Sequence, residues 1–166
     1  DGLDKLLIGL DGTADKSRLG ANAMIAVSMA AAHAAAAAHK MPLWRYLRGR
    51  EETPGPCFLP LPEVQIFGGG VHAGGRVDIQ DYMVTAIGAD SFTQALDWTA
   101  DVYRAAAGIM AEDGKLLGVA DEGGLWPDFD SNEEALDVLM RAIEAAGLDP
   151  GRDMAISLDI AASQFG

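Results

Sequence analysis

Five side chains able to transfer protons or bind a cation stand at the ends of short apolar runs or in the loops beside them. They are His72, Asp81, Asp121, Glu122 and Asp159. Carboxylates at strand ends suit Mg²⁺, a hard cation that takes oxygen ligands and is usually shared with a substrate carboxylate or phosphate. They also suit proton transfer, because a carboxyl group crowded by other carboxylates holds its proton more tightly and can act as a general acid.

Each of these residues also has a purely structural explanation. An unpaired charge inside an apolar strand costs several kcal/mol by rough estimate, so a ligand role explains Asp159 better than a buried ion pair does. Glu122 could equally cap a loop, and a lone His72 in a glycine-rich loop is a weaker indication of function. His33 and His39 are expected on the surface of a helix.

Two predicted strands position His72 and Asp81. Val64 to Phe67 forms a short apolar run, and Ile79 to Ile87 forms a longer one with alternating side chains. The 11 residues between them, 68 to 78, are too few for a parallel crossover, which needs a dozen or more. We therefore expect antiparallel strands, with the loop of His72 and the start of the second strand at the same end of the sheet.

Two further predicted strands position the other carboxylates. Leu116 to Ala120 leads into Asp121 and Glu122, and Met154 to Ile160 contains Asp159. Because a helix separates them, the order strand, helix, strand predicts a right-handed parallel crossover. The carboxylates would then lie at the C-terminal ends of neighbouring parallel strands, the face that carries the chemistry in barrels of alternating strands and helices.

The helices are easier to predict than the strands. Capping boxes indicate that one helix follows Ser91 and another follows Ser131. Near the N-terminus an alanine-rich helix is expected from 21 to 40, and a short helix from 42 to 47. Residues 48 to 62 contain four prolines and are predicted to link two domains.

Composition limits the possible partners and location. The 166 residues, 49% hydrophobic, suffice for one sizeable core or for one domain with part of another. The net charge of −13 argues against nucleic acid or an anionic membrane as a partner. Cys57 is the only cysteine, which fits a reducing compartment, so we expect a cytoplasmic protein. No stretch reaches the ~20 apolar residues that span a bilayer. With no initiator methionine and an unfinished pattern at Gly166, the chain is expected to be a fragment.

Six blocks follow one another along the chain. They are Leu-Asp-Gly-Thr with Lys-Ser-Arg-Leu-Gly-Ala-Asn-Ala (10–23), Met-Pro-Leu-Trp-Arg-Tyr-Leu (41–47), Gly-Gly-Val-His-Ala-Gly-Gly (69–75), Asp-Glu-Gly-Gly (121–124), Ser-Asn-Glu-Glu-Ala-Leu (131–136) and Leu-Asp-Ile-Ala-Ala-Ser (158–163). In these blocks the chain resembles the enolase family, phosphopyruvate hydratase, over essentially its whole length. The resemblance implies an α/β fold. Residues 1–55 would be the helical end of an N-terminal α+β capping domain with its linker, and residues 56–166 the first part of a TIM-like barrel of ββαα(βα)6 order.

The resemblance also implies an activity. Members of the family are lyases of glycolysis that remove water reversibly from 2-phosphoglycerate, a small phosphorylated three-carbon acid, to give phosphoenolpyruvate through an enolate held by Mg²⁺. Asp159 matches the first Mg²⁺ ligand, Glu122 the carboxylate that assists departure of the hydroxyl group, His72 the histidine near the phosphate, and Asp81 a second active-site glutamate. Asp121 would be a structural neighbour. The family usually forms dimers or assemblies of dimers, so a homo-oligomer is expected.

Three positions depart from the family pattern. The family usually has Asn where this chain has Gly68, and Glu where it has Asp81 and Gln164. Asp81 is one methylene shorter, which would withdraw its carboxylate by roughly an ångström, and catalytic geometry tolerates little displacement. A second hypothesis is therefore a paralogue acting on a phosphono or carboxyphospho analogue, as the carboxyphosphonoenolpyruvate synthases do. A third is a catalytically silent binding protein of the same fold.

Several parts of an enolase site have no counterpart in this sequence. These are the later barrel carboxylates, the lysine base and the mobile N-terminal serine loop. A partial barrel would leave strand edges open and the site incomplete, so the 166-residue chain alone is not expected to turn over substrate.

Overall fold

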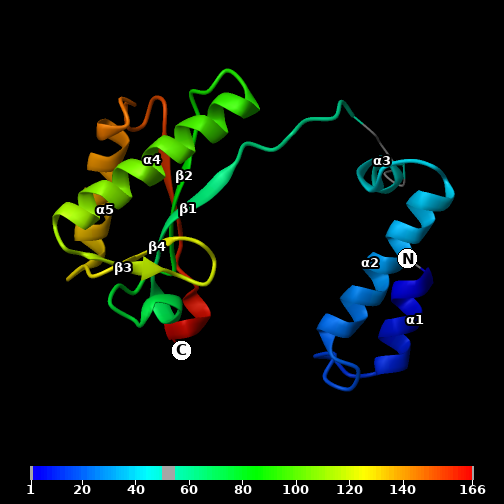
Figure 1. Cartoon of the computed structure of the whole chain (residues 1–166). Helices are drawn as coiled ribbons and strands as arrows, with labels where there is room; N and C mark the ends of the chain where they lie inside the picture. The colour runs from blue at the N-terminus through cyan, green and yellow to red at the C-terminus, as the bar shows by residue number, and fades with distance from the viewer. Residues whose placement is uncertain (1, 50–54, 166) are drawn as a thin grey trace. The chain divides into compact units, whose positions relative to one another are not determined.

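The computed structural model describes residues 2–49 and 55–165, the last two of these by their backbone alone. The chain forms two compact units, Asp1–Cys57 and Phe58–Gly166 (Figure 1). This division lies within the predicted linker 48–62, of which residues 50–54 fall outside the described part of the chain. Residues 55–62 form neither helix nor strand.

The described residues of the first unit form three helices. They are α1 (Gly2–Asp11), α2 (Ala21–Ala38) and α3 (Leu43–Arg48). The predicted alanine-rich helix and the short helix after it are both confirmed, with Pro42 at the N-cap of α3. The buried carboxylate of Asp11 closes the loop between α1 and α2, because it accepts hydrogen bonds from the backbone N–H groups of Thr13 (3.0 Å) and Leu19 (2.7 Å).

Helix α2 has one property that the sequence interpretation did not anticipate. Among the described residues it is the one helix long and apolar enough to cross a membrane, with a mean hydropathy of 1.4 over its 18 residues. One such helix is weak support for a membrane protein, because core helices of soluble proteins pass the same test. His33 and His39 are exposed, as predicted.

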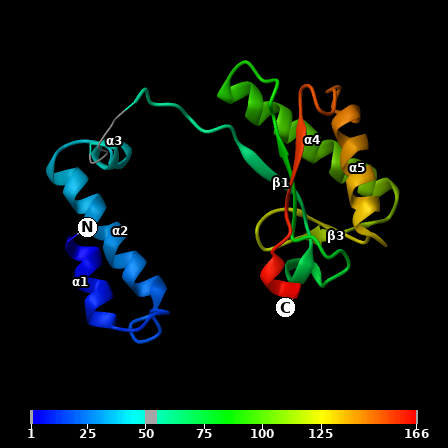
Figure 2. The same cartoon turned by 180° about the vertical axis from the view of Figure 1, so that it is seen from behind.

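A five-stranded mixed sheet forms the second unit, with two helices on one of its faces (Figures 1 and 2). In the order in which they pair, the strands are β3 (Leu116–Val119), β4 (Leu125–Pro127), β1 (Glu63–Gly68), β2 (Asp81–Thr85) and β5 (Ala155–Asp159). The helices are α4 (Phe92–Glu112) and α5 (Asn132–Ala145), and two 3-10 turns are η1 (Gly70–Ala73) and η2 (Ala162–Phe165).

Strands β1 and β2 are antiparallel, as predicted from the short connection between them. Gly68, the last residue of β1, lies opposite Asp81, the first residue of β2. Turn η1, which contains His72, lies between these two residues in the chain. The histidine loop and Asp81 therefore lie at the same end of the sheet, as expected.

Both predicted helix caps are also confirmed. The Ser91 hydroxyl accepts a hydrogen bond from the backbone N–H of Gln94 (3.2 Å) at the start of α4. The Ser131 hydroxyl accepts one from the backbone N–H of Glu134 (3.1 Å) at the start of α5. Each cap satisfies a helix N–H that has no partner within the helix.

The predicted parallel crossover from residues 116–120 to residues 154–160 is wrong. β3 and β5 lie at opposite edges of the sheet, and β3 turns directly into β4 as an antiparallel hairpin. β5 instead pairs antiparallel with β2. β4 escaped the sequence analysis because it is three residues long and ends in Pro127, too short for an alternating pattern.

The hairpin changes the place of Asp121 and Glu122 in the fold. Without β3 and β4, the elements of the second unit follow in the order β1, β2, α4, α5, β5, and α4 packs against α5. This is the beginning of the ββαα(βα)6 order that the resemblance implies. The two carboxylates thus lie in the turn of a hairpin inserted between two helices, not at the end of a barrel strand.

The core of the second unit lies between the sheet and its helices. Tyr82 and Val84 of β2 are fully buried in a cluster with apolar residues of α4 and α5. The alternate residues of β2, which include Asp81 and Met83, are only partly buried and belong to the opposite face of the sheet. That face, turned away from the helices, is the one that carries the carboxylate of Asp81.

Candidate active site

The loop Asp121–Gly124 is the turn of the β3–β4 hairpin, and three other elements hold it. Gln65 of β1, His72 of η1 and Tyr103 of α4 each form a hydrogen bond to the loop. The Tyr103 hydroxyl, for example, donates to the carbonyl of Gly123 (3.0 Å). The loop that carries Glu122 is therefore fixed by the sheet, by the histidine turn and by a helix.

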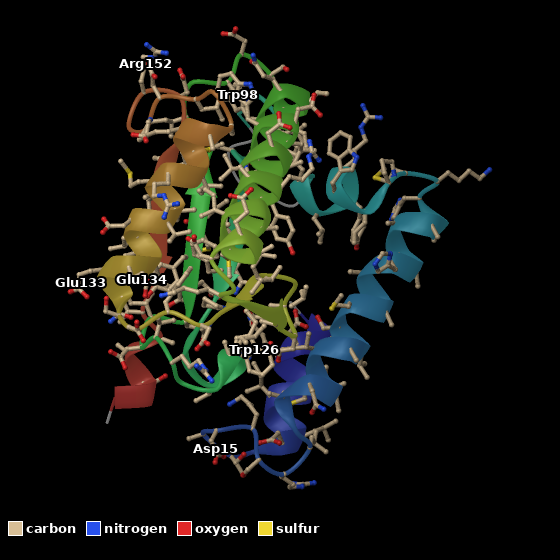
Figure 3. All side chains as sticks on the ribbon, turned by 60° about the vertical axis from the view of Figure 1, so that its left-hand side comes forward. Asp15, Trp98, Trp126, Glu133, Glu134 and Arg152 are labelled. Atoms are coloured by element: carbon tan, nitrogen blue, oxygen red, sulfur yellow. The ribbon has the colours of Figure 1, made fainter. Side chains whose placement is uncertain are left out.

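Trp126 of β4 links the hairpin to the histidine turn. Its indole Nε1 donates a hydrogen bond to the carbonyl of Ala73 in η1 (2.7 Å). The side chain, labelled in Figure 3, is half-buried. This bond gives the tryptophan the partner that a buried indole N–H requires.

Gln65 joins the two carboxylates that were predicted to be catalytic. Its side-chain Nε2 donates to the carboxylate of Asp81 and to Oε2 of Glu122 (3.3 Å). Its Oε1 accepts a hydrogen bond from the backbone N–H of Gly124 (2.9 Å). The sequence analysis missed Gln65, although a polar side chain inside the apolar run 64–67 was a signal that could have revealed it.

His72 forms an ion pair with Asp121, the neighbour of Glu122. The ring Nδ1 lies 3.0 Å from Oδ1 and 3.1 Å from Oδ2 of Asp121. The hydrogen bond with Asp121 raises the pKa of His72 above its ordinary value, although partial burial opposes this, and the charges of Glu122 and Asp81 raise it further. A raised pKa favours the cationic form of His72, and that form suits an anionic ligand.

A row of residues runs across β1, β2 and β5 at the end of the sheet where β1 ends and β2 begins. Asp81 lies opposite Gly68 on β1 and opposite Asp159 on β5. The structure therefore brings Asp81, Asp159, Glu122 and His72 to the same end of the sheet. Two carboxylates directly opposite each other in a sheet are destabilising unless a cation or a donor lies near them.

The burial expected for Asp159 is wrong. Asp159 is exposed, not buried in an apolar strand, because β5 lies at an edge of the sheet. Its Oδ1 accepts a hydrogen bond from the backbone N–H of Ala161 (2.8 Å). The desolvation cost that favoured a ligand role therefore does not apply, and the position of Asp159 opposite Asp81 supports that role instead.

Asp81 and Asp159 are the carboxylates to compare with the needs of a metal ion. Among the described residues, no group of three or more His, Cys, Asp or Glu side chains is placed to hold a metal ion. Asp159 presents exposed oxygens at this edge, beside Asp81. Mg²⁺ takes oxygen ligands, retains several waters and is commonly bound through one or two carboxylates and a substrate. The donor chemistry therefore fits Mg²⁺, with an incomplete set of protein ligands.

A side chain at position 68 would overlap with the methyl group of Ala120. A Cβ atom at Gly68 would lie 2.7 Å from the Cβ of Ala120, well inside van der Waals contact. Ala120 is buried, with 6% of its surface exposed, so its methyl group already fills the space. The asparagine expected from the resemblance would therefore force the backbone or Ala120 to shift. Gln164, the third departure, lies in η2, and its side chain is outside the described part of the chain.

Lys115 is the one lysine in residues 58–166, and its environment does not suit a general base. Its ammonium group pairs with Glu134, labelled at the start of α5 in Figure 3, and lies 3.8 Å from Asp130. The hydrogen bond with Glu134 raises the pKa of Lys115. A lysine base needs the opposite, a lowered pKa.

Family comparisons cover both units of the chain. Residues 1–47 match the sequence model described as the N-terminal domain of enolase. Residues 56–166 match the one described as the C-terminal TIM barrel domain of enolase. The two matches follow one another in the same order as the two compact units.

The contact between positions 68 and 120 predicts a compensating pair of substitutions. We expect Gly68→Asn to lower the free energy of unfolding by about 1–3 kcal/mol, the usual cost of overpacking. Ala120→Gly in the same chain should restore much of that loss, because it removes the clashing methyl group. Urea denaturation of both single variants and the double variant gives the coupling energy. Additive effects would contradict the predicted clash.

The ion pair predicts how His72 titrates. Because its pKa is raised on folding, the pair contributes stability that is fully present below the pKa of unfolded histidine and is lost as the pH rises through the folded pKa. NMR titration of the ring protons should give a pKa for His72 above the ordinary value of histidine. Asp121→Asn should lower it, because the carboxylate charge is lost. An unchanged pKa in this variant would disprove the pairing.

Proposed function

The chain belongs to the enolase family, and on that basis we propose that the protein is a lyase that removes water reversibly from 2-phosphoglycerate to give phosphoenolpyruvate. One observation supports this activity most directly. The carboxylates of Asp81 and Glu122 share the amide of Gln65, next to a histidine whose pKa is raised. This arrangement places a candidate acid beside a candidate anion-binding group.

Glu122 is the proposed acid. In the dehydration the C2 proton is removed, the C3–O bond breaks, and the departing hydroxyl group takes up a proton and leaves as water. Gln65 donates to Oε2 of Glu122, so Oε1 is the oxygen proposed to carry that proton. In the reverse direction the same carboxylate takes the proton back from water. We propose no residue of this chain as the base that removes the C2 proton, because Lys115, the one lysine in residues 58–166, is paired with Glu134.

His72 is the proposed phosphate-binding group. Asp121 stabilises its cationic form through the hydrogen bond to Nδ1. A cationic imidazole attracts a phosphate and donates to its oxygens through charge-assisted hydrogen bonds. Asp121 thus acts on the substrate through His72. The adjacent residues Asp121 and Glu122 therefore have two separate roles.

Asp159 is the proposed ligand for Mg²⁺, and its oxygen donors fit that ion. When bound, Mg²⁺ supplies positive charge where the negative charge of the enolate develops. Asp81, opposite Asp159, would be partly neutralised by the same charge. We further propose a cytoplasmic homo-oligomer, in keeping with the family and with the exposed, unpaired Cys57.

A second candidate function rests on the packing at Gly68. Ala120 fills the space into which the family's asparagine would extend, so the site presents a methyl group where the family has an amide. Together with the shorter Asp81, this difference favours a paralogue that acts on a phosphono or carboxyphospho analogue of the same three-carbon acid. The two functions share the fold and the proposed roles of Glu122 and His72, but differ in the substrate.

The role of Glu122 predicts a large loss of turnover in a single variant. In the natural protein that carries this chain, Glu122→Gln should lower kcat for 2-phosphoglycerate by about 10²–10⁴-fold, the usual contribution of a general acid. KM should change little, because the amide is nearly isosteric. Glu133→Gln makes the same change on the exposed surface of α5 (Figure 3) and should leave kcat unaltered. Unchanged kcat in Glu122→Gln would remove the assigned role.

Asp81→Glu separates the two candidate functions. If the protein is a phosphoglycerate lyase, its turnover of 2-phosphoglycerate should be high before the change, and the longer side chain should disturb the packed edge and lower kcat. If it is a paralogue, turnover should be low at first, and Asp81→Glu should raise it. Steady-state kinetics on 2-phosphoglycerate and on its phosphono analogue, with both proteins, measures the difference.

A further inference from the structure

We propose that Gln65 is a positioning residue for this reaction, which holds the carboxylates of Asp81 and Glu122 in one fixed relation. The inference rests on the proposed function and adds a residue to it. Its basis is the three hydrogen bonds of one side-chain amide, two to the carboxylates and one to the backbone of Gly124.

The orientation of the amide follows from the chemistry of its partners. A backbone N–H can only donate, so the group that faces Gly124 must be the carbonyl oxygen of Gln65. The NH₂ group then faces the carboxylates, and its two hydrogens match the two acceptors, Asp81 and Glu122. A flipped amide would place its oxygen against both carboxylates and leave three acceptors without a donor.

The backbone around Gln65 holds the side chain in place. β1 lies between β4 and β2, so Gln65 is on an interior strand next to both carboxylate-bearing segments. The register of β1 against β2 shifts by one residue between Gln65 and Phe67. Such a bulge re-aims side chains and is common beside active sites. Gln65 itself is half-buried.

Gly124 shows how tightly the amide is packed. A Cβ atom at position 124 would lie 2.5 Å from Oε1 of Gln65 and 2.7 Å from the backbone nitrogen of Gly68. Only a glycine therefore allows the hairpin turn to reach the amide oxygen. The hairpin, and with it Glu122, is docked onto β1 through this contact.

The reaction gives this arrangement a purpose. Two carboxylates at one end of the sheet repel each other. An amide NH₂ between them supplies a hydrogen to each, so that both remain close in spite of their charges. Gln65 thus links the two carboxylates through one amide group.

Two variants of Gln65 distinguish positioning from a merely structural role. Gln65→Met keeps the length of the side chain and removes all three hydrogen bonds. Gln65→Glu keeps an oxygen for the N–H of Gly124 and removes the donor to both carboxylates. In the natural protein we expect both variants to lower kcat by about 10²-fold, the effect of a displacement of roughly 1 Å, with KM changed much less. Gln94→Met removes an amide from the distant start of α4 and serves as the control.

The outcomes separate this inference from the proposed function. If the wild-type protein is active and Gln65→Glu retains its kcat, Gln65 only supports the hairpin and the inference is wrong. If the wild-type protein has no lyase activity, the proposed function fails, and NMR of the 166-residue chain decides the positioning. The side-chain amide protons of Gln65 should then shift in both Asp81→Asn and Glu122→Gln. A shift in neither variant would overturn the inference.

Discussion

The row of residues across β1, β2 and β5 determines where the site can lie. Gly68, Asp81 and Asp159 are neighbours because the antiparallel register of β2 against both other strands puts them at one level. A slip of one residue in β2 would turn Asp81 toward the helices and expose Tyr82. The burial of Tyr82 and Val84 against α4 and α5 therefore fixes the register, and the register fixes the position of the carboxylates. Packing on one face of the sheet places the chemistry on the other.

The hairpin of β3 and β4 brings Glu122 to this end of the sheet, although it is distant in the sequence from β1 and β2. It is attached to β1 by a short parallel pairing, Phe67 with Leu125, and by the hydrogen bonds of Gln65. His72 and Trp126 tie it to η1. The carboxylate of Glu122 thus depends on a small hairpin that is held by the burial of Leu125 in the core as well as by these polar contacts. Polar residues outside the predicted set, above all Gln65, contribute to these contacts.

Local patterns were enough to predict much of this architecture. The helices with Ser91 and Ser131 at their caps, the alanine-rich helix and the antiparallel first pair of strands each follow from a signal within about 20 residues, which local propensity and turn length can determine. The topology of the hairpin did not follow, because β4 is too short for a pattern and pairs with a strand more than fifty residues away in the chain. The burial of Asp159 was misjudged for a related reason: its apolar neighbours on β5 lie at a sheet edge, where sequence alone does not show what covers them. Gln65 was overlooked because its partners come from two segments that are far from it in the sequence, the start of β2 and the turn of the hairpin.

The overlap of a side chain at position 68 with the methyl group of Ala120 also constrains how such a site can change during evolution. An asparagine at position 68 lowers stability while the methyl group of Ala120 is present, because the two Cβ atoms would overlap. Loss of that methyl group first leaves only a small cavity, which a protein tolerates better than an overlap of backbone-linked atoms. Ala120→Gly is therefore the permissive step. A lineage that exchanges one type of site for the other would pass through an intermediate with glycine at both positions.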